Sequence, residues 1–258
     1  MGIEMDRHSS PSFSALLEIG LLFLPAIPAY LWMWPNLKGT QNDIVQAFVY
    51  LYILAGTLYI GLRRWNWSQL GLNLKGVWLT LVCGLALLAG RLMIILSIDW
   101  AVHPVSLTWL RLAGGLIYYF GLVGLVEELL FRGLIYRLLE DWRGVRWAIW
   151  GSSIGFGLWH IFGQGPLVGG ATLLIGLLFA QIRWRSGGIV GLIVLHGLWD
   201  LETVWLVSDS NAAIFSPGAI SFRYPALVNL GTVLLLLVPV FLAWIHPRFE
   251  RLQKRRPH

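Results

Sequence analysis

The chain has 258 residues, of which 57% are hydrophobic and 12% are charged, and its mean hydropathy is +0.69. Soluble domains carry roughly 25% charged residues, so this composition excludes an ordinary soluble globular protein. The net charge of +6 is what basic loops give a membrane protein, and it is no reason to expect a nucleic-acid partner.

Apolar runs of nearly the length needed to cross a bilayer, about 20 residues, recur along the whole sequence. Any one of them can be a buried helix of a large soluble protein, but that interpretation fails for all of them together. We expect residues 1–258 to form a single membrane-embedded domain, all-α and polytopic, with about eight transmembrane helices. In chain order the predicted spans are 13–35, 44–62, 76–98, 112–139, 146–163, 168–184, 187–206 and 226–245.

Individual runs carry further features. The segment before the first run is a poor positive region for a cleaved signal peptide, so we expect a retained membrane helix. The third run contains Cys83, which stands alone and supports neither a disulfide framework nor a cysteine metal site. It also contains Arg91, which we expect to bond to backbone carbonyls or to a partner acid. Glu202 falls near the end of the seventh run, where we expect it to be solvated.

Basic residues predict the orientation of the spans. Eight spans put both termini on one side, and with that side inside, most of the 19 basic residues fall on inner loops and ends. These inner residues are Arg7, Arg63, Arg64, Lys75, Arg137, Arg143, Arg146, Arg183, Arg185, Arg248, Arg251, Lys254, Arg255 and Arg256. Only Lys38 and Arg223 fall outside, and Arg91, Arg111 and Arg132 lie in or at the ends of spans. The bias follows the positive-inside rule and predicts cytoplasmic termini.

Three runs carry ionisable side chains far from their ends, in the segments EELLFR, FGLWH and HGLWD. A charged side chain at the bilayer centre costs at least about 2.5–3.5 kcal/mol on insertion scales, so such groups mark pairing, a wet cavity or chemistry. Helical spacing lets Glu128 pair with Arg132. Glu127 points elsewhere and has no such partner within its own helix.

The spacing in the other two segments is also helical. Phe156 stacks over His160, and His196 and Asp200 can project together. At 1.5 Å per residue, Glu127 and His160 lie roughly 20 and 21 Å from the inner ends of their spans. For His196 and Asp200 the figures are roughly 13 and 19 Å. These depths are compatible in a hydrocarbon layer of about 30 Å, so three helices can bring the side chains into one intramembrane polar cavity.

Such a cavity has a defined chemistry. A carboxylate and an imidazole beside a trapped water form a general-base pair, because either can accept a proton as the water attacks. A second histidine can donate a hydrogen bond to the oxyanion that forms when water adds to a carbonyl group. The constellation predicts hydrolysis of an amide or ester without a serine or cysteine nucleophile.

The order EExxxR, FxxxH and Hxxx(N or D) on successive hydrophobic segments resembles the CAAX-protease and bacteriocin-processing family of intramembrane glutamate proteases. The resemblance covers about residues 112–206, the core domain of that family. It implies a metal-independent endopeptidase without a cofactor, in a prokaryotic cytoplasmic membrane. It also implies that the partners are the lipid bilayer and a membrane-associated or lipidated protein or peptide, which is the substrate.

The resemblance also implies roles for single residues: catalytic roles for Glu127, His160, His196 and Asp200, and supporting roles for Glu128, Arg132 and Phe156. Glu127 and His160 would activate the water, while His196 and Asp200 would stabilise the oxyanion. The best understood proteases of the family carry asparagine at the last position, and its amide donates a hydrogen bond. An ionised Asp200 only accepts, so it would instead orient His196 or stay protonated.

Three alternatives remain open. One carboxylate and two histidines can bind zinc as in a metalloprotease, although the chain has no HExxH motif. Buried ionisable groups also mark proton relays and transporters, but a transporter more often has broken helices in corresponding halves. A non-proteolytic membrane scaffold or immunity protein of the same family is the third alternative.

Overall fold

The computed structural model describes residues 13–37, 40–98, 100–102, 108–207, 220–222 and 225–245, and almost all of these are helical. The helices are α1 (Phe13–Phe23), α2 (Ala26–Asn36), α3 (Thr40–Leu62), α4 (Val77–Ser97), α5 (Trp109–Leu116), α6 (Leu125–Glu128), α7 (Tyr136–Arg143), α8 (Val145–Gln164), α9 (Pro166–Ser186), α10 (Val190–Val207) and α11 (Pro225–Ile245). Two π-helical segments flank α6, namely η1 (Ile117–Gly124) and η2 (Leu129–Ile135). Strands β1 (Trp100–Val102) and β2 (Ile220–Phe222) pair antiparallel, with Trp100 opposite Phe222.

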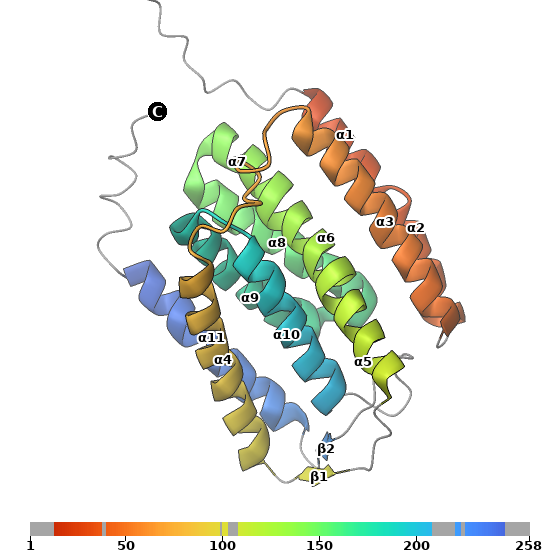
Figure 1. The fold of residues 1–258 in the computed structure, drawn as a ribbon, viewed down its shortest axis with the longest axis vertical. Coiled ribbons are helices and arrows are strands. Elements are labelled where there is room, and N and C mark those ends of the chain that lie inside the picture. Colours follow the sequence, from red (N-terminus) through yellow and green to blue (C-terminus); the bar gives the residue numbers. More distant parts are fainter. Residues whose placement is uncertain are drawn as a thin grey trace, which may run out of the picture.

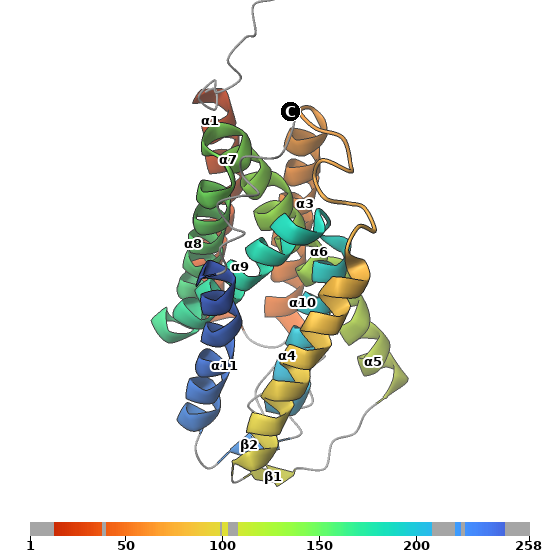
Figure 2. The same cartoon turned by 90° about the vertical axis from the view of Figure 1, so that its left-hand side faces the viewer.

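The helices form an elongated bundle in which successive passes alternate in direction (Figure 1). α1 and α2 run the same way, α3 returns, and α4 runs down to the small sheet. The segment from α5 to α7 then runs up, followed by α8, α9, α10 and α11 in alternating directions. The view from the side shows the same order, with α1 beginning and α11 ending toward the same end (Figure 2).

Four helical segments are long and apolar enough to cross a membrane: Ile44–Leu62, Val77–Ser97, Leu112–Arg143 and Pro166–Ser186. Shorter apolar helices occur at Leu17–Ala29 and Leu227–Phe241. Large apolar side chains, Phe48 and Met93 among them, are exposed on the outer faces of these segments. Exposed apolar surface of this extent is typical of lipid contact and not of a soluble monomer. Length, composition and exposure together indicate a membrane protein.

The first predicted span differs from expectation because it is broken. Two turn residues, Leu24 and Pro25, separate α1 from α2. Proline has no backbone N–H and its ring clashes with the preceding turn, so a helix usually kinks or ends there. Several residues behind the predicted orientation lie outside the described residues, namely Arg7, Lys38, Arg223 and the basic tail from Arg248.

The most extensive helix pair is the hairpin of α8 and α9, where glycines allow the backbones to approach closely. A Cβ atom added at Gly157 would lie 2.9 Å from the carbonyl oxygen of Gly169, which is too close for any other residue. Small residues serve this purpose between membrane helices. On its other side α8 packs on η2, where the rings of Phe131 and Phe156 meet edge to face at 5.3 Å. Packing on both sides thus fixes the helix that carries Phe156 and His160.

Candidate active site

The two adjacent glutamates lie on α6, a single helical turn between two π-helical segments. π-Helical turns are rare and frequently mark functional sites. The side chains of Glu128 and Arg132 are completely buried, at 0% exposure each, and Arg132 Nη1 lies 3.0 Å from Glu128 Oε1. The predicted ion pair therefore forms, although the helix around it is not the regular α-helix that the spacing argument assumed.

Helix α10 lies unusually close to η1, because each of the two helices has a glycine at the contact. A Cβ atom at Gly124 would lie 3.0 Å from the carbonyl oxygen of Ile193, on α10. A Cβ atom at Gly197 would lie 2.6 Å from Cγ of Phe120, on η1. His196 directly precedes Gly197, so this close approach brings its imidazole next to the glutamates.

The distances define one cluster. Oε2 of Glu127 lies 3.8 Å from Nε2 of His160 and 3.6 Å from Nε2 of His196. Nδ1 of His196 lies 2.8 Å from Oε1 of Glu128, and Nε2 lies 3.7 Å from Oδ2 of Asp200. Three helical segments far apart in the sequence, α6, α8 and α10, thus contribute ionisable groups to a common centre.

Phe156 occupies the middle of this cluster. Its ring meets the imidazole of His160 at 4.5 Å and that of His196 at 5.9 Å between centroids. The guanidinium carbon of Arg132 lies 4.1 Å from the same ring centroid. A cation over an aromatic face is attracted by the ring quadrupole, most strongly where water is excluded. All seven residues predicted from the sequence therefore lie together.

Hydrogen bonds to fixed acceptors determine the tautomers of both histidines. Nδ1 of His160 lies 2.9 Å from the carbonyl oxygen of Phe156, and a carbonyl only accepts, so Nδ1 carries the hydrogen. The lone pair of a neutral His160 is then on Nε2, which faces Glu127. In His196, Nδ1–H donates to the Glu128 carboxylate, and Nε2 faces Glu127 and Asp200. The two imidazoles thus present the same nitrogen to the centre of the cluster.

The two oxygens of Glu127 have different surroundings. Oε1 accepts a hydrogen bond from the hydroxyl group of Tyr50, on α3, and one of 3.3 Å from Nε1 of Trp159. Oε2 faces the histidines and accepts no hydrogen bond from the described residues. Sequence reasoning missed both donors. Trp159 adjoins His160 in the FGLWH motif and could have been noticed there, whereas nothing in the sequence singles out Tyr50.

Two arginines outside the cluster connect neighbouring helices to the segments that carry it. Arg183 donates from Nε to the carbonyl oxygen of Arg132 at 3.2 Å, which ties α9 to the ion-paired helix. Arg91 lies 3.2 Å from Glu202 and 3.0 Å from the hydroxyl group of Thr203, both on α10. The expectation of a partner acid for Arg91 is met by Glu202. The expectation that Glu202 is solvated is wrong, because its side chain is only 10% exposed.

No three His, Cys, Asp or Glu side chains of the described residues are placed to hold one metal ion. Asp200, at 23% exposure of its side chain, is the most accessible of the ionisable groups in the cluster. Among these groups, Asp200 is therefore the one nearest to the protein surface.

The helical, apolar bundle defines a membrane protein, and a glutamate–histidine cluster is buried within it. Residues 107–201 match the family described as Rce1-like: Type II CAAX prenyl endopeptidase Rce1-like. The match contains all seven clustered residues and confirms the resemblance inferred from the three motifs. At the level of the family it indicates a hydrolase of the CAAX endopeptidase type. No curated protein and no solved structure matches the chain.

Proposed function

We propose that this protein is an intramembrane endopeptidase that hydrolyses a peptide bond with a glutamate-activated water and without a metal ion. The observation that carries the proposal is the position of Glu127 Oε2, 3.8 Å from Nε2 of His160 and 3.6 Å from Nε2 of His196. The family match adds support, because it indicates a CAAX-type endopeptidase.

Glu127 and His160 activate the water. Both present an acceptor to the same space, the carboxylate through Oε2 and the neutral imidazole through Nε2. One water can donate its two hydrogens to this pair while its oxygen faces a substrate carbonyl. As the oxygen attacks the carbonyl carbon, one of the acceptors takes a proton. The new C–O bond forms, and the carbonyl π electrons move to the oxygen.

His196 stabilises the oxyanion. Its Nδ1–H is directed to Glu128, so it donates from Nε2 only when it carries a second proton. The carboxylates of Glu127, Glu128 and Asp200 surround this ring and balance the charge of the imidazolium. Asp200, an acceptor, therefore acts through His196 and does not itself bond to the oxyanion. When the tetrahedral intermediate collapses, the abstracted proton passes to the amide nitrogen and the C–N bond breaks.

The membrane arrangement belongs to the same proposal. The chain forms one membrane-embedded domain with eight spans, both termini in the cytoplasm and a polar cavity around the cluster. The alternating passes and the basic residues near the ends of α3, α7 and α9 support this topology. The substrate is a membrane-associated protein or peptide, and the name of the matching family points to prenylated C-termini as the first class to test.

The test compares membranes from cells that carry the native protein or the Glu127→Gln variant. Glutamine keeps the size and the hydrogen-bond acceptor but cannot take the proton. New C-termini found by mass spectrometry only with the native protein would identify the cleaved chains. Purified protein should then cleave a peptide of that sequence, and a chelator should leave the rate unchanged.

Glu18→Gln is the matched control, because this residue forms a partly exposed ion pair with Arg64 away from the cluster. It should retain full activity. Cleavage that persists in a folded Glu127→Gln variant would contradict the proposal. Stoichiometric zinc in active protein, with activity lost to chelation and restored by zinc, would replace the glutamate mechanism with a metal one.

A further inference from the structure

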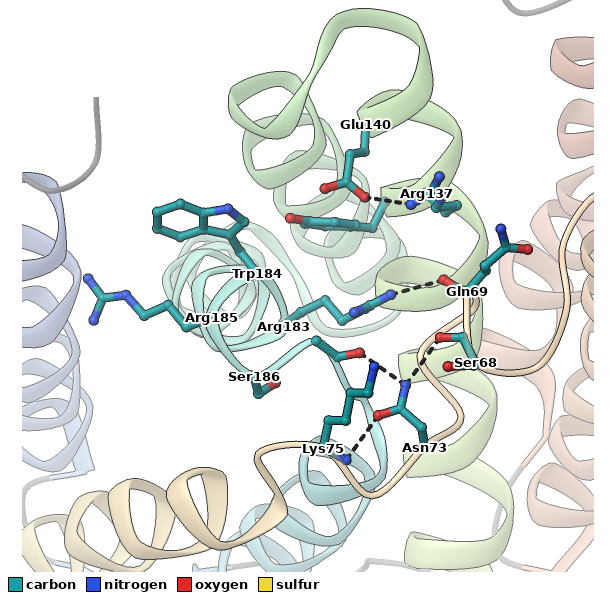
Figure 3. Close-up of a pocket in the computed structure, with 12 residues that line it drawn as sticks. Ser68, Gln69, Asn73, Lys75, Arg137, Glu140, Arg183, Trp184, Arg185 and Ser186 are labelled. Atoms are coloured by element: carbon teal, nitrogen blue, oxygen red, sulfur yellow. Dashed lines mark hydrogen bonds and ion pairs between the residues drawn. The ribbon is translucent and has the colours of Figure 1, made fainter. Parts of the chain in front are cut away.

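A second polar feature lies at the C-terminal end of α9, and none of the seven residues of the glutamate–histidine cluster lines it. The loop before α4, the helix α7 and the C-terminal end of α9 enclose a pocket of about 380 Å³ (Figure 3). Ligand pockets in proteins span about 300–1,000 Å³, so the space suits a small molecule or a headgroup and not a folded partner.

The lining of this pocket is strongly basic. Lys75, Arg137, Arg183 and Arg185 contribute to it, against a single acid, Glu140. The charge of Arg137 is balanced by two carboxylates: Glu140 at 3.2 Å, and Asp141, which does not line the pocket, at 2.8 Å. Arg185 points away from the other cations (Figure 3). Lys75 and Arg183 are therefore the cations that face the space.

These two cations differ in mobility. Arg183 is 7% exposed, and its guanidinium is fixed by hydrogen bonds to the carbonyl oxygens of Arg132 and Gln69, at 3.2 and 3.1 Å. Lys75 is exposed and has no ion pair among the described residues. Its side chain extends into the space between Arg183 and Asn73 (Figure 3). The pocket thus combines a fixed guanidinium with an adjustable point charge.

The loop that carries Lys75 is held in place by hydrogen bonds. The side-chain amide of Asn73 donates to the carbonyl oxygens of Ser68 and Gly187, both at 3.1 Å, and its oxygen accepts from the backbone N–H of Lys75 at 2.9 Å. The backbone N–H of Ile189 donates to the carbonyl oxygen of Gly71 at 2.7 Å. The pocket is therefore built before any ligand arrives.

The surroundings connect the pocket to the lipid. Leu74 and Trp78, on either side of Lys75 in the chain, are 77% and 81% exposed. Large apolar side chains this exposed beside a cation are typical of the membrane interface, where headgroups and acyl chains meet. Basic pockets between helices on this side of a membrane protein bind phosphate-bearing headgroups.

We propose that the pocket between α7, α9 and the loop before α4 binds a phosphate group, with Lys75 and Arg183 as its cationic ligands. An arginine guanidinium and a lysine ammonium group are both established ways to hold phosphate oxygens. The phosphate can be part of an anionic lipid headgroup or of a soluble phosphate compound. This site does not depend on the proposed hydrolysis.

The experiment titrates the purified full chain with three probes and counts bound molecules by native mass spectrometry. The probes are dihexanoylphosphatidylglycerol, dihexanoylglycerol, which has the same chains without phosphate, and inorganic phosphate. Lys75→Gln removes one cation whose side chain has no ion pair among the described residues. Arg63→Gln is the matched control, because Arg63 is an exposed cation that follows α3, bonds to Tyr59 and does not line the pocket.

We expect saturable binding at one site that Lys75→Gln weakens about fivefold and Arg63→Gln leaves unchanged, since one cation near an anionic lipid contributes about 1 kcal/mol. Lys75→Glu should weaken it further. Binding of phosphatidylglycerol alone assigns the phosphate to a lipid, and binding of inorganic phosphate alone assigns it to a soluble compound. Equal binding of dihexanoylglycerol, equal losses in the two glutamine variants, or no saturable binding of any probe would overturn the proposal.

Discussion

Replacing Glu128 by alanine should destabilise the fold far more than replacing a carboxylate on the surface. Glu128 and Arg132 are completely buried and lie 3.0 Å apart, and the same carboxylate oxygen accepts from His196. Removing one member of a buried ion pair costs about 3–5 kcal/mol, because the remaining charge stays away from water without a partner. We therefore expect Glu128→Ala to lower the free energy of unfolding by about 3–5 kcal/mol.

The comparison variant is Glu18→Ala, which breaks the pair with Arg64. That pair has a shorter N–O distance, 2.7 Å, but its side chains are 26% and 25% exposed. Exposed pairs contribute only about 0–1 kcal/mol, since water screens them. The free energies can be measured by reversible unfolding in mixed micelles with an increasing fraction of SDS, followed by tryptophan fluorescence.

A third variant separates the lost pairing from the lost volume. Replacing Glu128 by leucine and Arg132 by methionine removes both charges and leaves only the Nδ1–H of His196 without its acceptor. The double variant should therefore recover most of the stability that Glu128→Ala loses. The reasoning fails if Glu128→Ala loses no more stability than Glu18→Ala. It also fails if the double variant is as unstable as the alanine variant.

Two further predictions follow from the contacts and from the charge bias. Tyr50→Phe should slow hydrolysis of the cleaved peptide about 10- to 100-fold, because a hydrogen bond to a charged group contributes about 1.5–3 kcal/mol and this one holds Glu127 in place. An unchanged rate would contradict this. On a Cys83→Ser background, a cysteine at Lys38 should react with an impermeant reagent from outside and a cysteine at Arg64 should not. The reverse pattern would refute the predicted orientation.

Much of the fold follows from apolar patterning alone. Each predicted run overlaps helix in the described residues, as 76–98 overlaps α4 and 226–245 overlaps α11. This succeeds because a chain in lipid must satisfy its backbone hydrogen bonds internally, so that length and composition decide the element. Pro25 is visible in the sequence, but the prediction of a single span over 13–35 took no account of it.

The site was predictable where it depends on spacing along one helix, as for Glu128 with Arg132 and for His196 with Asp200. It was not predictable for contacts between helices that no motif or depth argument marks. The bond from Tyr50 to Glu127 joins residues 77 positions apart, and no local pattern encodes it. The pairing of Glu202 with Arg91 was missed for the same reason, since position near the end of a span does not reveal which neighbour covers a side chain.

The π-helical segments on both sides of α6 have a consequence for how this chain tolerates insertions and deletions. Residues successive along an α-helix are turned by about 100°, so losing one residue between Ile117 and Gly124 would rotate both glutamates relative to the helix that precedes them. A deletion between Glu128 and Arg132, at residues 129–131, would instead rotate Arg132 away from Glu128. The number of residues in each π-helical segment is therefore as restricted as the chemical identity of the cluster residues. Homologous chains should vary in length in the loops and not between residues 117 and 135.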